Sequence, residues 1–270
     1  MPLSLSVNID NSSVKNYYNN LNKNYLNCWE SFAKKDIDRF EKNFIRDSLD
    51  LLAKARKNPK VLEVGFGPGR IAREILKYNI EYYGEDISEE MLKSFEQTFG
   101  KEKKIKKLKV EDISKGITFK EKDFDLIVAW RVLYYNQNWK EIINNLSGKL
   151  GKNGILVFCM PNKYSLSIFG NLFGKVKGNY TSLKELKGVL EKNRLRPKIK
   201  GYAKVSDIVY DICVNSWLAK PLLIFEIMLR KVFGELFLSK MFYVQTRREV
   251  NINEETLNYY CHCRNRLCDL

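Results

Sequence analysis

The sequence is short of the residues that build disulfide scaffolds and membrane spans. Its 270 residues include only six cysteines, too few for a disulfide-dense fold. The start, 1–11, lacks the basic segment and the long apolar run of a secretory signal. Even the most apolar segment, 216–238, contains five Lys, Arg and Glu residues, so no charge-free stretch of about 18 apolar residues could span a membrane. These absences predict a cytoplasmic protein without a spanning helix.

Histidine is nearly absent as well. The only one, His262, lies in the tail 251–270 close to Cys261, Cys263 and Cys268. Because the spacing of these side chains matches no common zinc pattern, we expect no metal site. A histidine general base is not expected either, since the single histidine lies so near the end of the sequence.

Acidic residues are outnumbered by basic ones. Lys and Arg total 47 against 32 Asp and Glu, a formal charge of +15, and 44% of the residues are hydrophobic, enough for a substantial core. The excess is concentrated late, because from Lys163 onward 19 Lys and Arg face 10 Asp and Glu, a net charge of +9. Such a balance favours an anionic partner or surface without naming one.

Short apolar runs alternate with longer amphipathic stretches after residue 60. The runs predict seven strands, at 61–64, 80–83, 105–110, 124–129, 155–160, 196–201 and 241–246. Helices are expected at 31–56, 70–78, 88–98, 138–150 and 181–193. Such alternation predicts an α/β fold with a mainly parallel sheet flanked by helices. We expect the last two strands to form an antiparallel hairpin at one edge.

A glycine-rich turn follows the first predicted strand. Gly65, Gly67 and Gly69 come directly after 61–64, where glycines permit positive φ angles and let a ligand approach the backbone. Asp86 ends the second strand 21 residues after Gly65, close to the spacing at which an acidic side chain accepts hydrogen bonds from ribose hydroxyls. The pair predicts a site for a nucleoside cofactor.

The neighbouring residues narrow the choice of cofactor. Asp112 ends the third strand, where a carboxylate could accept a hydrogen bond from an adenine amino group. Arg70 occupies the position at which a dinucleotide-binding turn needs a small residue, which disfavours an NAD site. No Gly-Lys-Ser/Thr follows the glycines, which disfavours a P-loop. Glu63 would repel a pyrophosphate but suits a cationic or amine-bearing ligand.

These features resemble the class I S-adenosylmethionine-dependent methyltransferases, whose first motif is acidic-x-Gly-x-Gly-x-Gly. The resemblance covers about residues 60–162 and rests on 63–69, 83–92, Asp112, 123–128 and 150–154. It implies a Rossmann-like seven-stranded sheet. Pro161 and Asn162, at the end of the fifth strand, resemble the small-molecule branch that includes quinone-biosynthesis methyltransferases.

The resemblance also implies S-adenosylmethionine as the cofactor and a role for each matching residue. The implied cofactor-binding residues are Glu63, Gly65, Gly67, Gly69, Asp86, Ile87, Met91, Asp112 and Ile113. The glycines line the methionine part and Asp86 holds the ribose. Ile87 and Met91 flank the adenine, and Asp112 with Ile113 binds its amino edge.

Alternatives stay open for several of these residues. Ile87 and Met91 could simply pack a helix. Glu111 is a rival for the role given to Asp112, and Glu85 is a weaker rival for that of Asp86.

Four segments of the chain are expected on this basis. They are an N-terminal helical lid at 1–59, an S-adenosylmethionine-binding core at 60–162, a C-terminal part of the same domain at 163–250 with a helical insertion before the last strand, and the tail 251–270.

The acceptor of the methyl group is expected over the carboxyl ends of the strands, where open α/β sheets bind their ligands. The candidates are Tyr18, Arg131, Tyr134, Tyr135 and Asn162. Tyr18 belongs to an aromatic segment, with Tyr17, Tyr25 and Trp29, that resembles the lid of many small-molecule methyltransferases. Packing under the next helix is the alternative for Tyr134 and Tyr135. Because methyl transfer depends chiefly on alignment, no general base is assigned.

The expected reaction is methyl transfer to an O, N or C atom of a small, apolar or lipid-like acceptor. An RNA methyltransferase and an inactive cofactor-binding subunit are the alternatives. Nucleic acid is not expected, since 129–132 lacks the Asn/Asp-Pro-Pro-aromatic motif of enzymes that methylate base amino groups. Cys159 lacks the companion Pro-Cys of cytosine-C5 enzymes, so we interpret it as a buried core thiol. The oligomeric state is not predicted.

One amphipathic helix is expected late in the chain, at 222–238, with seven large apolar side chains on one arc. A basic amphipathic helix can lie on an anionic membrane or form an apolar acceptor pocket. Cover for the sheet or a dimer contact is the other interpretation. The first reading predicts a cytoplasmic enzyme in peripheral contact with a membrane.

Overall fold

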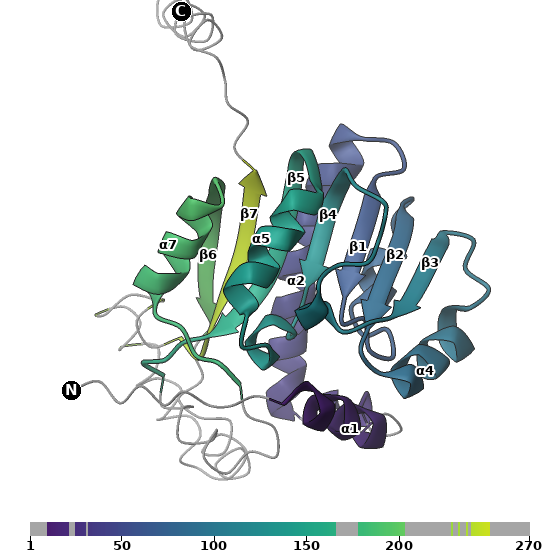
Figure 1. Cartoon of the computed structure of the whole chain (residues 1–270), viewed down its shortest axis with the longest axis horizontal. Coiled ribbons are helices and arrows are strands. Elements are labelled where there is room, and N and C mark those ends of the chain that lie inside the picture. The colour runs from purple at the N-terminus through teal and green to yellow at the C-terminus, as the bar shows by residue number, and fades with distance from the viewer. Residues whose placement is uncertain are drawn as a thin grey trace, which may run out of the picture.

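A seven-stranded sheet dominates the computed structural model (Figure 1). The structure describes residues 10–21, 25–30, 32–165, 178–202, 228, 232, 236 and 239–248. The strand order is β3-β2-β1-β4-β5-β7-β6. The strands are β1 (Lys60–Val64), β2 (Glu81–Asp86), β3 (Ile105–Val110), β4 (Phe124–Ala129), β5 (Leu150–Pro161), β6 (Leu195–Tyr202) and β7 (Met241–Arg248).

The first five strands are parallel, and β7 pairs antiparallel with both β5 and β6. This arrangement confirms the predicted mainly parallel sheet with an antiparallel pair at one edge. All six residues of β4 are buried, as expected for a central strand covered on both faces. The carboxyl ends of β1 to β5 therefore meet at one edge of the sheet.

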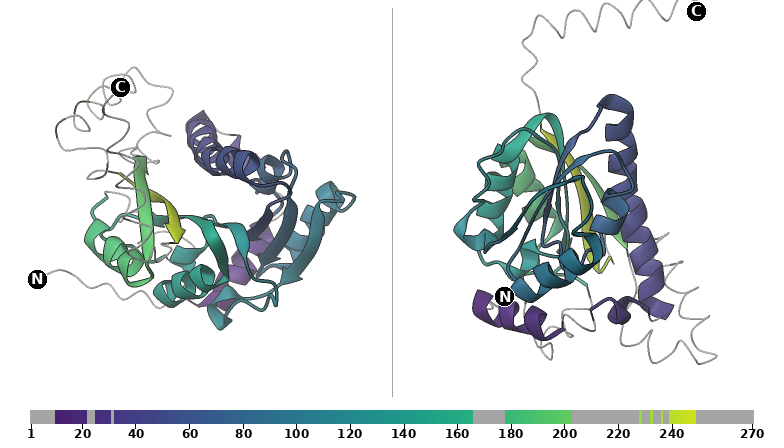
Figure 2. Two further views of the ribbon diagram at one scale, coloured as in Figure 1. Left: turned by 90° about the horizontal axis from the view of Figure 1, so that it is seen from above. Right: turned by 90° about the vertical axis from the view of Figure 1, so that its right-hand side faces the viewer.

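Helices cover both faces of the sheet. In Figures 1 and 2, α5 and α7 lie on one face and the long α2 lies on the other. The short α1 lies below the edge at which the parallel strands end. The helices are α1 (Asn11–Leu21), α2 (Phe32–Ala55), α3 (Ala72–Ile75), α4 (Glu89–Phe99), α5 (Trp139–Lys149) and α7 (Leu183–Lys192). The described part of the chain also contains the 3-10 turns η2 (Asn27–Trp29), η3 (Ile113–Lys115) and η4 (Leu133–Tyr135).

Local capping explains where two helices begin. The hydroxyl of Ser88 accepts a hydrogen bond from the amide of Met91 at 3.1 Å, so α4 starts immediately after β2. The hydroxyl of Ser182 accepts one from the amide of Glu185, also at 3.1 Å, and opens α7. Both helices lie within about two residues of the predicted bounds.

The helix predicted at 70–78 is much shorter, since α3 covers four residues only. On both sides of α3, hydrogen bonds between residues three apart replace the helical pattern. The amide of Gly69 donates to the carbonyl of Phe66, and the amide of Tyr78 donates to the carbonyl of Ile75. The apolar side chains of 70–78 recur as predicted, but most of the segment forms a series of tight turns rather than a helix.

Part of the predicted architecture lies outside the described residues. The insertion helix 222–238, apart from Met228, Val232 and Leu236, and the tail 251–270 belong to it. Peripheral contact with an anionic membrane therefore stays a prediction. Among the described residues, no helix has the length and apolarity needed to cross a membrane, and no group of three His, Cys, Asp or Glu could hold a metal ion.

Gly69 should tolerate no side chain, because its φ is +91° and an added Cβ would lie 2.2 Å from Cε2 of Phe99. We expect Gly69→Ala to lower the free energy of unfolding by about 1–3 kcal/mol. The matched variant Gly148→Ala, at an exposed position of α5 with nothing within 4 Å, should raise it by about 0.5–1 kcal/mol. Urea denaturation measures both, and equal effects of the two variants would contradict this packing role.

Candidate functional site

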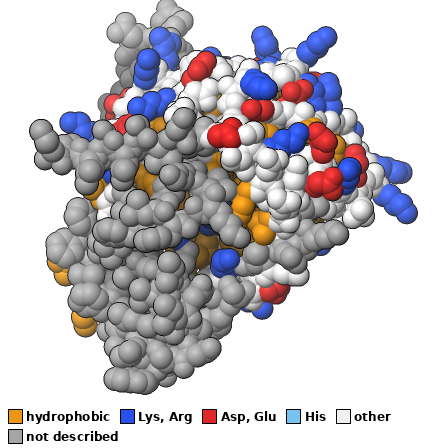
Figure 3. Space-filling view, turned by 60° about the horizontal axis from the view of Figure 1, so that its bottom comes forward, with side chains coloured by type: hydrophobic (Ala, Val, Ile, Leu, Met, Phe, Trp, Pro, Cys, Tyr) orange, Lys and Arg blue, Asp and Glu red, His pale blue; other side chains and the backbone are white. Residues whose placement is uncertain are grey.

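A pocket opens between α1 and the carboxyl ends of β1 to β4. It holds about 690 Å³ of space, part of it open to solvent. Figure 3 looks toward this end of the molecule, where hydrophobic side chains lie at the bottom of a hollow. The described residues that line the pocket are Asn11, Val14, Tyr18, Tyr25, Val64, Gly65, Gly67, Glu85, Asp86, Ile87, Met91, Glu111, Asp112, Ile113, Trp130, Arg131, Val132, Tyr135 and Asn136.

The turn after β1 presents bare backbone to this pocket. Gly67 has a φ of +53°, and no atom lies within 4 Å of where its Cβ would be. Its amide donates a hydrogen bond to Oδ2 of Asp86 at 2.8 Å. The amide of Gly65 bonds the carbonyl of Glu85 at 2.7 Å, which ties the turn to the end of β2. A ligand can therefore lie against the main chain here.

Asp86 is buried beside the turn. Its Oδ1 accepts a hydrogen bond from the amide of Ser88 at 2.9 Å. Burial raises the pKa of Asp86 to about 6, although the amides of Gly67 and Ser88 lower it. The amides of Gly67 and Ser88 bond one oxygen each and that of Ile87 also faces the carboxylate, whose remaining lone pairs can serve hydroxyl groups of a ligand.

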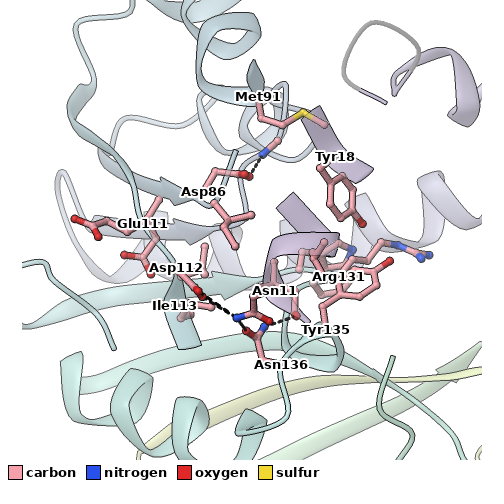
Figure 4. A pocket seen from close by; sticks show the side chains of 18 of the residues that line it. Asn11, Tyr18, Asp86, Met91, Glu111, Asp112, Ile113, Arg131, Tyr135 and Asn136 are labelled. Carbon is pink, nitrogen blue, oxygen red and sulfur yellow. Dashed lines mark hydrogen bonds between the residues drawn. The ribbon is translucent and has the colours of Figure 1, made fainter. Parts of the chain in front are cut away.

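The adjoining β3 end places a second carboxylate in the pocket. Asp112 caps η3 and accepts hydrogen bonds from the amide and hydroxyl of Ser114. Nδ2 of Asn11 donates to both oxygens of Asp112, at 3.0 and 3.2 Å (Figure 4). The same nitrogen lies 2.7 Å from the hydroxyl of Ser114 and 3.4 Å from Oδ1 of Asn136. These four acceptors around one amide nitrogen form a place suited to an amino group.

Glu85 and Glu111 complete the acidic side of the pocket. Glu85 is 1% exposed, and neither of its carboxyl oxygens has a hydrogen-bond partner among the described residues. Burial, then Glu111, raises the pKa of Glu85 to about 7, while Lys109 and Lys149 lower it. Four carboxyl groups thus line the side of the pocket formed by β2 and β3.

Two predicted cofactor residues are absent from the pocket lining. Glu63 points to the face of the sheet where the Tyr82 hydroxyl donates a hydrogen bond to its Oε2 at 2.8 Å. Gly69 packs against Phe99 instead of facing the pocket. Both belong to the recognised motif, but the alternation of a strand and the course of the turn direct them away from the cavity.

The acceptor-side candidates separate in the same way. Tyr18, Arg131 and Tyr135 line the pocket, and the rings of Tyr18 and Tyr135 meet edge to face at 5.8 Å. Tyr134 packs against Tyr135 at 4.3 Å and does not line it. Asn162 does not line it either, since its Nδ2 donates to the carbonyl of Ser239.

A buried carboxylate that the sequence analysis missed organises this side. Glu41 of α2 is fully buried, and its Oε1 accepts hydrogen bonds from Nη2 and Nε of Arg131 at 2.6 and 3.0 Å. Its Oε2 accepts one from Nη2 of Arg70 at 2.8 Å. Although burial raises the pKa of Glu41, Arg131 and Arg70 lower it to about 2. The sequence does contain a signal for this residue: Glu41 lies four residues from both Ile37 and Ile45, on the apolar face of the predicted helix.

Arg131 itself adopts a φ of +59°, uncommon for a residue with a side chain. Its amide donates to Sγ of Cys159 at 3.3 Å. Burial raises the pKa of this thiol to about 12. Cys159 is fully buried, as predicted, and a protonated thiol is a poor nucleophile.

Comparison with known proteins identifies the family of this chain. The profile of the methyltransferase domain family matches residues 37–197. The chain belongs to that family. A search of curated proteins found no match.

Solved structures agree on the fold of this methyltransferase domain. Magnesium protoporphyrin IX methyltransferase from Synechocystis PCC 6803, with bound S-adenosylhomocysteine, has a TM-score of 0.60 and 14% identity over 89% of this chain and 100% of its own. A SAM-dependent methyltransferase from Archaeoglobus fulgidus has a TM-score of 0.56 and 19% identity over 78% and 94%. The cyclase SpnF has a TM-score of 0.59 and 13% identity over 88% and 96%. The fold is that of the class I S-adenosylmethionine-dependent methyltransferases.

Glu63 should make the stability of the domain depend on pH. Burial raises its pKa from 4.5 to about 8, against the hydrogen bond from Tyr82. The folded protein then keeps this proton to a higher pH than the unfolded chain does, so the free energy of unfolding falls as pH rises from 4.5 to about 8. Glu63→Gln should remove at least about 1 kcal/mol of that fall.

Urea denaturation at about pH 5 and about pH 8.5 measures the effect. Glu96→Gln, at an exposed position of α4, is the matched control and should keep the wild-type decline. An unchanged decline in Glu63→Gln would show that this carboxyl is ionised in the folded protein.

Proposed function

We propose that the chain transfers the methyl group of S-adenosylmethionine to a small-molecule acceptor with a large apolar or aromatic surface. The observation that carries the proposal is the pocket at the ends of β1 to β4, which combines an open glycine turn with carboxylates at both neighbouring strand ends. Membership of the methyltransferase domain family supports it.

The residues present fit this cofactor. The open backbone at Gly67 leaves room for the methionine part, and Asp86 has lone pairs for the two ribose hydroxyls. Asp112 and the other acceptors around Nδ2 of Asn11 suit the adenine amino group. The adenine would take the place that this side chain of α1 occupies. When bound, S-adenosylmethionine supplies an electrophilic methyl group on a positively charged sulfur.

An acidic pocket also suits a cationic ligand. The chain carries a net +15, yet four carboxyl groups line the β2 and β3 side of the pocket. A sulfonium ion is attracted to such a place, whereas a pyrophosphate would be repelled. This charge pattern supports S-adenosylmethionine over a dinucleotide.

The acceptor side offers aromatic walls and few groups that could remove a proton. Burial raises the pKa of Tyr18 well above its usual value, and Tyr134 and Tyr135 raise it further. Burial likewise raises that of Tyr25. These hydroxyls stay protonated near neutral pH, so they orient an acceptor and exclude water rather than act as bases. Rate enhancement then comes chiefly from positioning.

The similarity to SpnF shows why the reaction must be measured, since that protein has this fold and is a [4+2]-cyclase. Purified protein should transfer label from methyl-labelled S-adenosylmethionine to small molecules of a metabolite extract. Label in added RNA instead would favour the RNA methyltransferase alternative, and label in neither would favour a cofactor-binding subunit.

Asp86 should dominate the binding of the nucleoside part. We expect Asp86→Asn to weaken the binding of S-adenosylhomocysteine by about 1–3 kcal/mol. The amide of asparagine lacks the charge and half of the acceptor capacity that two ribose hydroxyls need. Titration calorimetry measures the affinity, with thermal unfolding as a check on folding. Asp47→Asn, at an exposed position of α2, should bind like wild type. Equal affinities of wild type and Asp86→Asn would remove the ribose assignment.

A further inference from the structure

Two guanidinium groups lie close together on the side of the pocket opposite its carboxylates: Arg131 lines the pocket, and Arg70 is buried behind it. Arg70 follows the glycine turn of β1, and Arg131 follows β4. Arg70 lies over the ring of Trp29 at 3.8 Å, and Arg131 lies over the same ring at 4.9 Å. Figure 4 shows Arg131 beside Tyr18 and Tyr135, across the pocket from Asp86, Glu111 and Asp112.

The charges around this pair do not cancel. Arg70 bonds Asp38 as well as Glu41, and Asp38 also pairs with Lys42 at 2.6 Å. Among the described residues, three cations (Arg70, Arg131 and Lys42) therefore share two carboxylates, which leaves a net charge of +1. An arginine cannot release its proton here, so the excess persists at every physiological pH. The cluster is only partly exposed to solvent, so a ligand of opposite charge would be favoured beside it.

Hydrogen-bonding capacity is left over as well. The bonds of Arg131 to described residues use its amide, Nε and Nη2, and Nη1 has no such partner. Its side chain is 23% exposed and lines the pocket. Nε of Arg70 is buried without a partner among the described residues. Nη1 of Arg131 can therefore donate a hydrogen bond to an anionic oxygen in the pocket, while Arg70 adds positive charge behind it.

The position of the two arginines suggests that their ligand is the methyl acceptor. This step rests on the proposed function: with the nucleoside over β2 and β3, the reacting end lies over β1 and β4. The amino-acid part of S-adenosylmethionine is a zwitterion and its sulfur is positive, so the bound cofactor adds no net negative charge here, although its carboxylate could pair with one arginine. An anionic acceptor offsets both the excess and the sulfonium.

We propose that Arg131, held by Glu41 and supported by Arg70, binds an anionic group of a flat aromatic acceptor. Glu41 fixes the orientation of the guanidinium by accepting hydrogen bonds from its Nε and Nη2. A fixed orientation is what recognition of a ligand carboxylate by arginine needs. The rings of Tyr18 and Tyr135 give the rest of the molecule an apolar wall. The anionic group is a carboxylate or a group of similar size and charge.

A matched pair of fluorescent probes tests this proposal. Anilinonaphthalene sulfonate is an aromatic anion, and N-phenylnaphthylamine is the same skeleton without the sulfonate. With S-adenosylhomocysteine bound, wild type should bind the anion at least about tenfold more tightly than the neutral probe. Arg131→Met should lose that preference by about tenfold and keep its affinity for the neutral probe within about twofold. Equal affinities of wild type for the two probes would overturn the proposal.

Two further variants separate the site from general charge and from folding. Lys101→Met removes one exposed positive charge and should leave the preference for the anion unchanged. The double variant Arg131→Met with Glu41→Gln keeps the net charge of the chain and strands no buried carboxylate. It should lose the preference as Arg131→Met does. Equal losses in Lys101→Met and in the double variant would overturn the proposal.

The cofactor's own carboxylate is the competing occupant. S-adenosylhomocysteine carries an amino-acid group, and methylthioadenosine lacks it. Arg131→Met should leave the ratio of their affinities within about twofold of wild type. A tenfold loss for S-adenosylhomocysteine alone would assign the cation pair to the cofactor and overturn the proposal. Failure of wild type to bind either nucleoside would instead refute the proposed function.

Discussion

Glu41 is the acceptor that segments far apart in the sequence share. From α2 it receives hydrogen bonds from Arg70 after β1, from Arg131 after β4 and from the hydroxyl of Tyr243 on β7. Removing its charge would leave two guanidinium groups buried with less compensation, which is among the costliest changes a protein interior can undergo. The long helix, the glycine turn and the antiparallel edge of the sheet are thereby held in one arrangement. The pocket depends on that arrangement because Arg131 forms part of its wall.

The division of charge within the pocket follows from the order of the strands. Acidic side chains end β2 and β3, while the arginines follow β1 and β4, and the topology places these two pairs side by side. A basic chain can therefore present an acidic surface to one part of a ligand and a basic surface to another. On the face in Figure 3, acidic and basic side chains intermingle over the described surface outside the hollow.

The sequence was sufficient where the decisive forces are local. Apolar runs located all seven strands, and the ends of β2 and β3 placed Asp86 and Asp112 in the pocket. It was insufficient where contacts are distant, because Asn11 and Glu41 meet partners about a hundred residues away. Family motifs also name residues without giving their direction. Glu63 and Gly69 match the motif, yet they pack against Tyr82 and Phe99.

The left-handed backbone at Arg131 affects which substitutions this position can accept. A residue with a side chain in that conformation costs roughly 1 kcal/mol relative to glycine. A descendant that no longer used the guanidinium could therefore recover stability there with glycine, provided that Glu41 was lost too. At this position the arginine therefore offsets its backbone cost only through the contacts of its guanidinium, with Glu41 and with whatever the pocket binds.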